Sequence, residues 1–139
     1  MTPAALARLH ARCFTTPPPW SEASFAALLD SPHVFALTAS AANAFALGRV
    51  IGPEAELLTL ATAPDARRQG LARALMAEFE RAASARGAET LCLEVAETNT
   101  AALALYTRCG FTPNGRRPGY FGTADGKPLA ALLLCKPLG

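Results

Sequence analysis

The chain has 139 residues, enough for a sizeable hydrophobic core, and we expect a single domain over residues 1–139. With 51% hydrophobic and 17% charged residues, the composition excludes a disordered chain. The net charge of +2 does not favour nucleic acid or an anionic membrane as a partner. Neither a transmembrane run nor the apolar core of a signal peptide is visible, so we expect a cytoplasmic protein.

The first part of the chain predicts two helices. Thr2 can cap a helix that begins at Pro3. The prolines at 17–19 end this helix, because consecutive prolines cannot continue it. Ser21 can then cap a second helix.

Apolar runs bounded by turn residues predict the strands of a sheet. The predicted strands are 34–38, 44–51, 54–63, 90–96, 111–114 and 129–134. Helical spacing predicts further helices at 69–86 and 99–108, each followed by a glycine. The strand, helix and strand between 54 and 96 would join two parallel strands and open a crevice at their carboxyl ends. We expect an α/β fold with a mixed sheet, and a polar, glycine-rich loop at 116–127.

Residues 57–72 join a buried strand, a break at Pro64-Asp65 and the start of the long helix. Gly70 lets the backbone approach a ligand at a helix start, where the first amides lack internal partners. With the helix dipole, this place suits a phosphate or pyrophosphate, although an ordinary basic helix start on a solvated surface is the alternative. The arginines that cluster here are Arg67, Arg68 and Arg73.

The predicted strand at 90–96 carries one ionisable group, Glu94. Alternation puts Glu94 and Cys92 on one face and the other apolar side chains on the opposite face. Glu94 could be a carboxylate that points into solvent. It could also act as a general base, because it would lie on an apolar strand near the crevice.

The chain has four widely spaced cysteines, which are Cys13, Cys92, Cys109 and Cys135. Since no C-x-x-C pair is present, buried free thiols are favoured over a disulfide or a metal site. His10 and His33 are interpreted as a helix-face residue and a loop residue. We therefore expect no metal.

Two stretches together resemble the GNAT acetyltransferase superfamily. Residues 67–72, RRQGLA, match the signature Q/R-x-x-G-x-G/A, whose amides hold the pyrophosphate of acetyl-CoA in that superfamily. The stretch from Asn99 through Ala102 and Tyr106 to Gly110-Phe111 is similar to its second signature, N-x-x-A-x-x-x-Y-x-x-x-G-F. Separately, Asn99 could be a helix cap and Tyr106 a core aromatic, but their order after the phosphate loop favours the superfamily.

The resemblance implies the GNAT fold, with a mixed, mostly antiparallel sheet and helices on both faces. A central pair of parallel strands is splayed in this fold to bind acetyl-CoA. Because the chain starts on its first helix, the usual N-terminal strand is expected to be missing or reduced.

Within the superfamily, the chain resembles the bacterial ribosomal-protein-alanine N-acetyltransferases, which acetylate a protein's terminal amine. The resemblance implies acetyl-CoA as co-substrate and an acceptor protein N-terminus, the N-terminal alanine of ribosomal protein S18, with a monomer or weak dimer. It implies Glu94 as general base and Tyr106 as general acid. The implied cofactor-binding residues are Leu60, Ala61, Thr62, Arg67, Arg68, Gln69, Gly70, Leu71, Ala72, Arg73 and Asn99. Candidates for binding the acceptor are Trp20, Arg116, Arg117 and Tyr120.

Some positions depart from the family pattern. Ala72 replaces a second glycine, Tyr120-Phe121 replaces a pair of tyrosines, and the acidic residues common before the last strand are missing at 127–129. These departures bear on acceptor specificity more than on cofactor use. A small amine or a lysine side chain is therefore an alternative acceptor, and a non-catalytic acyl-CoA-binding module is an alternative function.

The chemistry expected of such an enzyme needs few groups. The amine must lose a proton, and the thiolate that leaves must gain one. An α-amino group has a pKa of about 8, so a carboxylate can take its proton at neutral pH, directly or through a water. Because the amine can attack the thioester itself, Cys92 and Cys109 need no covalent role.

Overall fold

The structure is a computed structural model that describes residues 1–14, 19–67, 69–121 and 129–138, with the side chains of 120 and 121 excepted. In chain order the elements are α1 (Pro3–Cys13), α2 (Glu22–Leu29), β1 (Val34–Thr38), β2 (Ala44–Ile51), β3 (Glu54–Thr62), the short 3-10 turn η1 (Pro64–Ala66), α3 (Leu71–Ala85), β4 (Thr90–Ala96), α4 (Thr100–Arg108), β5 (Thr112–Phe121) and β6 (Leu129–Pro137). No described helix is long and apolar enough to span a membrane. The expected α/β class is confirmed.

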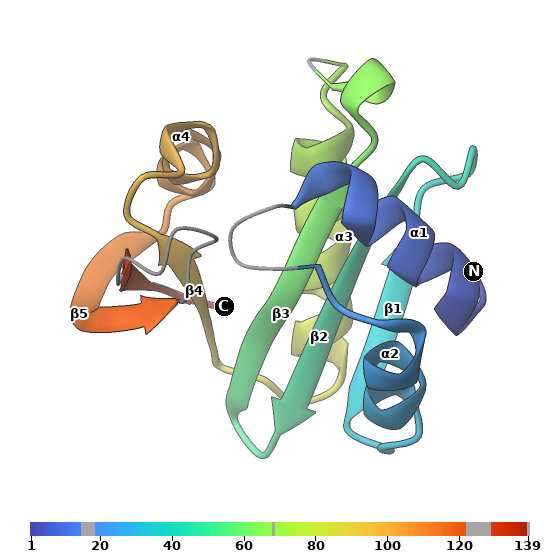
Figure 1. Cartoon of the computed structure of the whole chain (residues 1–139). Helices are drawn as coiled ribbons and strands as arrows, with labels where there is room; N and C mark the ends of the chain where they lie inside the picture. Colours follow the sequence, from blue (N-terminus) through green and yellow to red (C-terminus); the bar gives the residue numbers. More distant parts are fainter. Residues whose placement is uncertain (15–18, 68, 122–128, 139) are drawn as a thin grey trace.

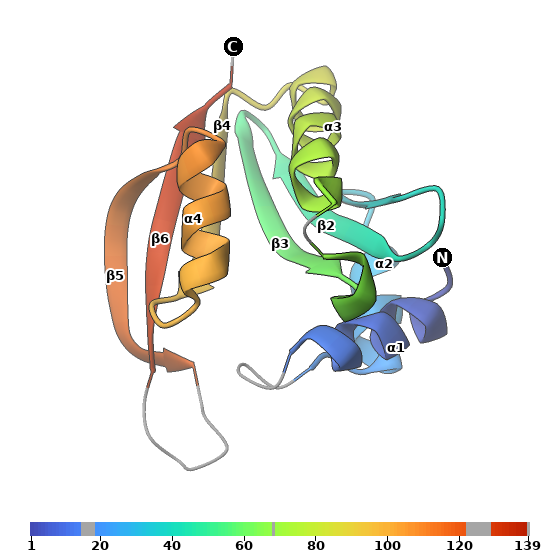
Figure 2. The same cartoon turned by 90° about the horizontal axis from the view of Figure 1, so that it is seen from above.

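The strands form a 6-stranded sheet in the order β1-β2-β3-β4-β6-β5. Only β3 and β4 pair in parallel, and all the other neighbours pair antiparallel. Helices α1 and α2 cover one face of the β1-β2-β3 half, whereas α3 and α4 lie on the opposite face of the sheet (Figures 1 and 2). The mixed sheet with helices on both faces is therefore as expected.

Helices α1, α2 and α4 start at a side-chain cap. The Thr2 side chain accepts from the Ala5 amide at 3.1 Å, and the Ser21 side chain accepts from the Ser24 amide. Asn99 caps α4 in the same way. The interpretation of Asn99 as a helix cap is therefore confirmed.

A β-bulge in β3 changes which face its side chains occupy. Leu47 of β2 pairs with Thr59, but its neighbour Gly48 pairs with Leu57, which leaves Leu58 as an extra residue. Before the bulge, Leu57 packs in the core under α3; after it, Thr59 contacts α1. The bulge therefore lets β3 contribute side chains to the hydrophobic cores on both faces of the sheet, one under α3 and one under α1.

The parallel pairing of β3 with β4 ends at Leu57, just before the bulge. It covers Glu54 to Leu57 on β3 and Thr90 to Leu93 on β4, although both strands continue. Figure 2 shows the two strands running apart beyond this point. The expected splay of the central parallel pair is confirmed, and it opens the sheet between residues 58–62 and 94–96.

The end of the sheet differs from the prediction. Strand β5 extends to Phe121, so that 116–121 is part of a strand and not of the expected loop; residues 122–127 of that loop lie outside the described residues. Glycine and proline weaken the strand signal here, but pairing with β6 overrides local propensity. Register shifts accommodate these residues between Pro113 and Gly115 and between Arg117 and Phe121. Strand β6 likewise continues to Pro137.

The prediction of free thiols is wrong for two of the cysteines. Cys92 and Cys135 form a disulfide, whereas Cys13 and Cys109 are free and half-buried. The reason is the register of β4 and β6, which places the two cysteines directly opposite each other with Cα atoms 4.1 Å apart. Their separation of 43 residues hides this proximity in the sequence.

We predict that the Cys92–Cys135 bridge is found in the protein purified without reductant. Alkylation followed by proteolysis and mass spectrometry should give one linked peptide, with only Cys13 and Cys109 alkylated. Reduction should lower the free energy of unfolding by about 2–4 kcal/mol, because the unfolded chain gains entropy. Alkylation of Cys92 or Cys135 before reduction would contradict this pairing.

We also predict that Gly48→Ala destabilises the protein. A Cβ atom at Gly48 would overlap the ring of Phe79 on α3, so the cost should be about 1–3 kcal/mol in urea unfolding. The double change Gly48→Ala with Phe79→Leu should cost less than the sum of the two single changes, because the smaller side chain makes room. Additive costs would mean that the ring is not the obstacle.

Candidate active site

A cavity of about 290 Å³ lies where the sheet opens. The predicted cofactor-binding residues among those that line it are Leu60, Ala61, Thr62, Arg67, Ala72 and Asn99. Tyr106 of α4 lines it too, together with Cys13 and Phe14 at the end of α1. The cavity thus joins the ends of β3 and α1 to the starts of α3 and α4.

The start of α3 supplies hydrogen-bond donors beside this cavity. Gly70 is the N-cap, with a left-handed φ of 75°, and no described side chain caps the helix. The first amides of α3 are therefore without helical or capping partners, at the positive end of the helix dipole. Among the predicted loop residues, Gln69 and Arg73 are exposed beside Gly70, Leu71 is half-buried, and Arg68 lies outside the described residues.

Arg67 folds back toward the sheet. Its Nε donates to the Thr62 carbonyl at 3.2 Å, and the Cys13 thiol donates to the same oxygen at 3.2 Å. The two bonds hold the end of β3 at a defined place beside α1. The guanidinium of Arg67 stays exposed, so its charge is available to a phosphate.

Tyr106 is nearly buried, with 7% of its surface exposed, and its ring meets that of Phe111 edge-on. Burial raises the pKa of Tyr106, and the neighbouring Cys109 raises it further. The phenol therefore keeps its proton at neutral pH. Such a group can donate a proton to a leaving thiolate but cannot serve as a base.

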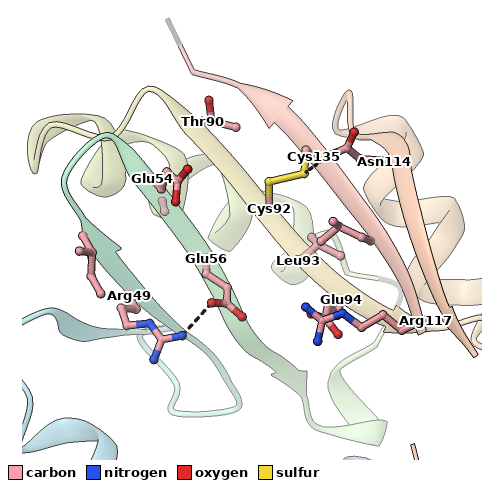
Figure 3. Close-up of a pocket in the computed structure, with 13 residues that line it drawn as sticks. Arg49, Glu54, Glu56, Thr90, Cys92, Leu93, Glu94, Asn114, Arg117 and Cys135 are labelled. Carbon is pink, nitrogen blue, oxygen red and sulfur yellow. Dashed lines mark hydrogen bonds and ion pairs between the residues drawn. A yellow bond between two sulfur atoms is a disulfide. The ribbon is translucent and has the colours of Figure 1, made fainter. Parts of the chain in front are cut away.

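Glu94 lies on a second cavity, an open groove of about 750 Å³ on the other face of β4 (Figure 3). Its side chain is only 17% exposed, so the alternative of a solvent-facing carboxylate is wrong. Oε1 lies 3.3 Å from the guanidinium of Arg117. Oε2 is buried, and no described group hydrogen-bonds to it. A buried acceptor without a donor costs about 1–3 kcal/mol, so Oε2 keeps a capacity to accept a hydrogen bond that no described group uses.

The rest of the groove combines charged side chains with the disulfide. Arg49 and Glu56 form an ion pair of 2.8 Å on one side, and the sulfur atoms of Cys92 and Cys135 lie on its floor (Figure 3). Sequence reasoning missed the ion pair, although counting outward from the turn at Gly52-Pro53 places these residues opposite each other. The groove is much larger than the cavity at Tyr106.

The structure separates some of the predicted site residues. Glu94 and Tyr106 line different cavities, Glu94 the groove and Tyr106 the smaller cavity at the opening of the sheet. Arg116 pairs with Glu97 at 3.1 Å, and the described lining of the two cavities includes neither Arg116 nor Trp20. Arg117 lines the groove instead. Tyr120 belongs to β5, but its side chain lies outside the described part of the chain.

Comparison with known proteins identifies the family. The model of the acetyltransferase (GNAT) family matches residues 4–111. The chain belongs to the GNAT acetyltransferases. It is therefore an N-acetyltransferase, and its mixed sheet with the parallel pair β3 and β4 is the GNAT fold.

Individual relatives agree with this assignment. The GNAT chain is 40% identical over 117 residues to the ribosomal protein bS18-alanine N-acetyltransferase of Escherichia coli K12, covering 83% of this chain and 79% of that one. It is 34% identical over 122 residues to the N-alpha-acetyltransferase RimI of Mycobacterium tuberculosis, covering 83% and 75% of the two chains.

Solved structures have the same fold. The crystal structure of the ribosomal-protein-S18-alanine N-acetyltransferase from E. coli superposes with a TM-score of 0.86 at 36% identity, covering 97% of this chain and 86% of that one. Arabidopsis thaliana NAA60 in complex with acetyl-CoA gives a TM-score of 0.84 at 17% identity, covering 99% and 93%. At 17% identity, the similarity to NAA60 shows a common fold alone.

Proposed function

We propose that this GNAT enzyme transfers the acetyl group of acetyl-CoA to the N-terminal amine of a protein, the N-terminal alanine of ribosomal protein S18. The relatives named for that reaction support the acceptor. The observation that carries the proposal is the splay of β3 and β4, with free helix amides beside it and a buried carboxylate next to it. We further propose that residues 1–139 act as one cytoplasmic domain, a monomer or weak dimer.

Acetyl-CoA is proposed to bind across the opening. The amides that follow Gly70 and the guanidinium groups of Arg67, Arg68 and Arg73 would hold its phosphates, with Gln69, Leu71, Ala72 and Asn99 around them. Beyond Leu57 the backbone of β3 has no pairing with β4, so Leu60, Ala61 and Thr62 lie on a strand edge that β4 leaves open, in which the Thr62 carbonyl already accepts from Arg67 and Cys13. Such an edge suits the amides of the pantetheine arm.

Glu94 and Tyr106 are proposed to move the protons. Oε2 of Glu94 would take the proton of the terminal amine, directly or through one water, and the nitrogen lone pair would attack the thioester carbon. When the carbon–sulfur bond breaks, the phenol of Tyr106 would give its proton to the sulfur. An amide at the end of β3 would stabilise the oxyanion. No described cysteine is needed as a nucleophile, and the Cys92 sulfur is already in the disulfide.

The size of the groove favours a peptide over a small amine. At about 750 Å³ it exceeds what a free amino acid or polyamine would fill, and it extends along the sheet from Glu94 toward Thr90 (Figure 3). Trp20, Arg116, Arg117 and Tyr120 are the proposed acceptor-binding residues. Of these, Arg117 has the strongest support, because it contacts Glu94.

The function can be tested with defined acceptors. The enzyme and acetyl-CoA are incubated with a peptide of the S18 N-terminus, the same peptide with its terminal amine blocked, a blocked peptide with a free lysine, and a panel of small amines. We expect thiol release and a mass gain only with the free S18 terminus. Preference for lysine or a small amine would replace this acceptor, and thiol release with none of them would favour a binding module.

We predict that Glu94→Gln lowers kcat by about 10²–10⁴-fold, because the amide cannot accept the amine proton. The acetyl-CoA affinity measured by calorimetry should change less than about twofold, since Glu94 lies on the other cavity. The control is Glu97→Gln, which removes a carboxylate that pairs with Arg116. Equal turnover of Glu94→Gln and the wild type at neutral pH would remove Glu94 from the base role.

We predict that Gly70→Glu abolishes acetyl-CoA binding, because a carboxylate would enter the space where the phosphates bind. Gly52→Glu is the matched control: both glycines have a left-handed φ and open space where a Cβ would lie, but Gly52 is at the far end of β3. Backbone strain is therefore similar in the two variants. If Gly70→Glu and Gly52→Glu both bind acetyl-CoA as the wild type does, the phosphates do not bind at Gly70.

A further inference from the structure

Lys136 is a half-buried cation of β6 that the proposed mechanism does not use. Its side chain is 25% exposed, and its Nζ forms an ion pair of 2.7 Å with Oε1 of Glu80 on α3. The same Nζ donates a hydrogen bond of 2.5 Å to the carbonyl of Cys109, the C-cap of α4. One side chain of the sheet therefore joins both of the helices that lie over it.

This junction lies at the end of the sheet where β3 and β4 are still paired. Lys136 is opposite Leu91 of β4, within the segment of β4 that pairs with β3. Helices α3 and α4 both begin near the opening, and both run toward the end of β6 (Figure 2). Lys136 therefore connects the two helices away from the opening between their first turns.

The last turn of α4 closes on Tyr106. The Phe111 amide donates to the Tyr106 carbonyl at 3.0 Å, and the Gly110 amide donates to the Thr107 carbonyl at 3.1 Å. Gly110 has the left-handed φ of 94° that this type of helix end requires. Since the rings of Phe111 and Tyr106 also meet edge-on, the residues that end α4 hold both the backbone and the ring of Tyr106.

The bond from Lys136 completes this helix end. The last carbonyls of a helix have no partner within it and lie at the negative end of its dipole, so a cation is favourable there. A hydrogen bond from a charged donor is also stronger than one between neutral groups. Glu80 balances the charge of the ammonium group, which would otherwise be half-buried without a counter-ion.

The charges of Glu80 and Lys136 also act on the thiol of Cys109. Burial raises the pKa of Cys109, Glu80 raises it further, and Lys136 lowers it. This thiol lies on the same turn of α4 as Tyr106, and it raises the pKa of that phenol in turn. The junction at Lys136 is therefore close to the group proposed to protonate the leaving sulfur.

We propose that Lys136 is a positioning residue for Tyr106, because it holds the last turn of α4 at a fixed distance from α3. The phenol then keeps its place beside the sulfur of a cofactor whose phosphates are bound at the start of α3. This proposal rests on the proposed function. The described lining of the two cavities does not include Lys136, which acts through the Cys109 carbonyl.

Three single substitutions test the junction. Lys136→Met removes the ammonium group and keeps an unbranched side chain, so the Cys109 carbonyl loses its donor. Glu80→Gln removes a charge but keeps an oxygen that can accept from Nζ, so the bond to Cys109 persists. Arg81→Met is the matched control, because it removes a cation from the exposed position next to Glu80 on α3. Urea unfolding checks that each variant is folded.

The kinetic experiment uses the acceptor that the wild type acetylates. Lys136→Met should lower kcat by about 10–100-fold, because a displacement of about 1 Å between reacting groups can cost this much. Its acetyl-CoA affinity by calorimetry should change less than about twofold, since the first turn of α3 is unaltered. Glu80→Gln and Arg81→Met should keep kcat within about twofold of the wild type.

A change at Tyr106 tests whether Lys136 acts through the phenol. Tyr106→Phe removes the proton donor and keeps a ring against Phe111. In this background, Lys136→Met should lower kcat by less than about a further twofold, because groups that act as a unit are not additive. A general loss of packing would lower kcat by the same factor in both backgrounds.

Hydrogen exchange supplies a second readout that does not depend on turnover. The amides of Gly110 and Phe111 should exchange about tenfold faster in Lys136→Met than in the wild type, Glu80→Gln or Arg81→Met. If the wild type acetylates no amine, or if Tyr106→Phe keeps the full kcat, the proposed function or its proton donor fails. The exchange rates still decide whether Lys136 holds the end of α4.

Several results would overturn the proposal. Equal exchange of Gly110 and Phe111 in all variants would show that this turn does not need Lys136. A fall in kcat that is as large in Arg81→Met as in Lys136→Met would indicate the loss of a charge and not of the bond. A fall of the same factor in the Tyr106→Phe background, or a parallel loss of acetyl-CoA affinity, would separate Lys136 from the phenol.

Discussion

The separation of β3 from β4 is the constraint on which the rest of the site depends. Backbone groups of a sheet have to be hydrogen-bonded, and these two strands stop pairing at Leu57 and Leu93 while both continue. The bulge at Leu58 permits this, because an extra residue bends β3 and moves its end toward α1. On its other side β4 keeps its pairing with β6 through Ala96. The opening is therefore built from one strand that turns away and one that is held in place.

The two sides of the opening carry different chemical groups, and this difference suits acetyl transfer. The start of α3 and the free edge of β3 offer hydrogen-bond donors, which an anionic cofactor needs. Tyr106 adds a phenol whose burial keeps it protonated. Across β4, Glu94 offers an acceptor oxygen in a groove wide enough for a peptide. Hydrogen-bond donors thus lie on one side of the opening, where we propose that the cofactor binds, and the carboxylate lies where we propose that the amine loses its proton.

Two contacts that join distant parts of the chain hold the surroundings of the opening. The disulfide between Cys92 and Cys135 ties β4 to β6 beneath the groove that Glu94 lines. On the other side of the opening, the His10 ring of α1 bonds to the Trp20 amide just before α2 and to Thr59 of β3. Both contacts are buried or half-buried and link elements far apart in sequence. The surroundings of the opening are therefore held by contacts that the sequence motifs do not contain.

The sequence by itself determined the element types, the GNAT signatures and the face of β4 on which Glu94 lies, because caps, periodicity and glycine positions are local properties. It predicted the splay only through the family resemblance. It missed the length of β5, where pairing overrode the weak propensity of glycine and proline. The disulfide, the pair of Glu94 with Arg117 and the partners of His10 were decided by the tertiary structure. Each depends on register or packing between residues far apart in the chain, which no local pattern records.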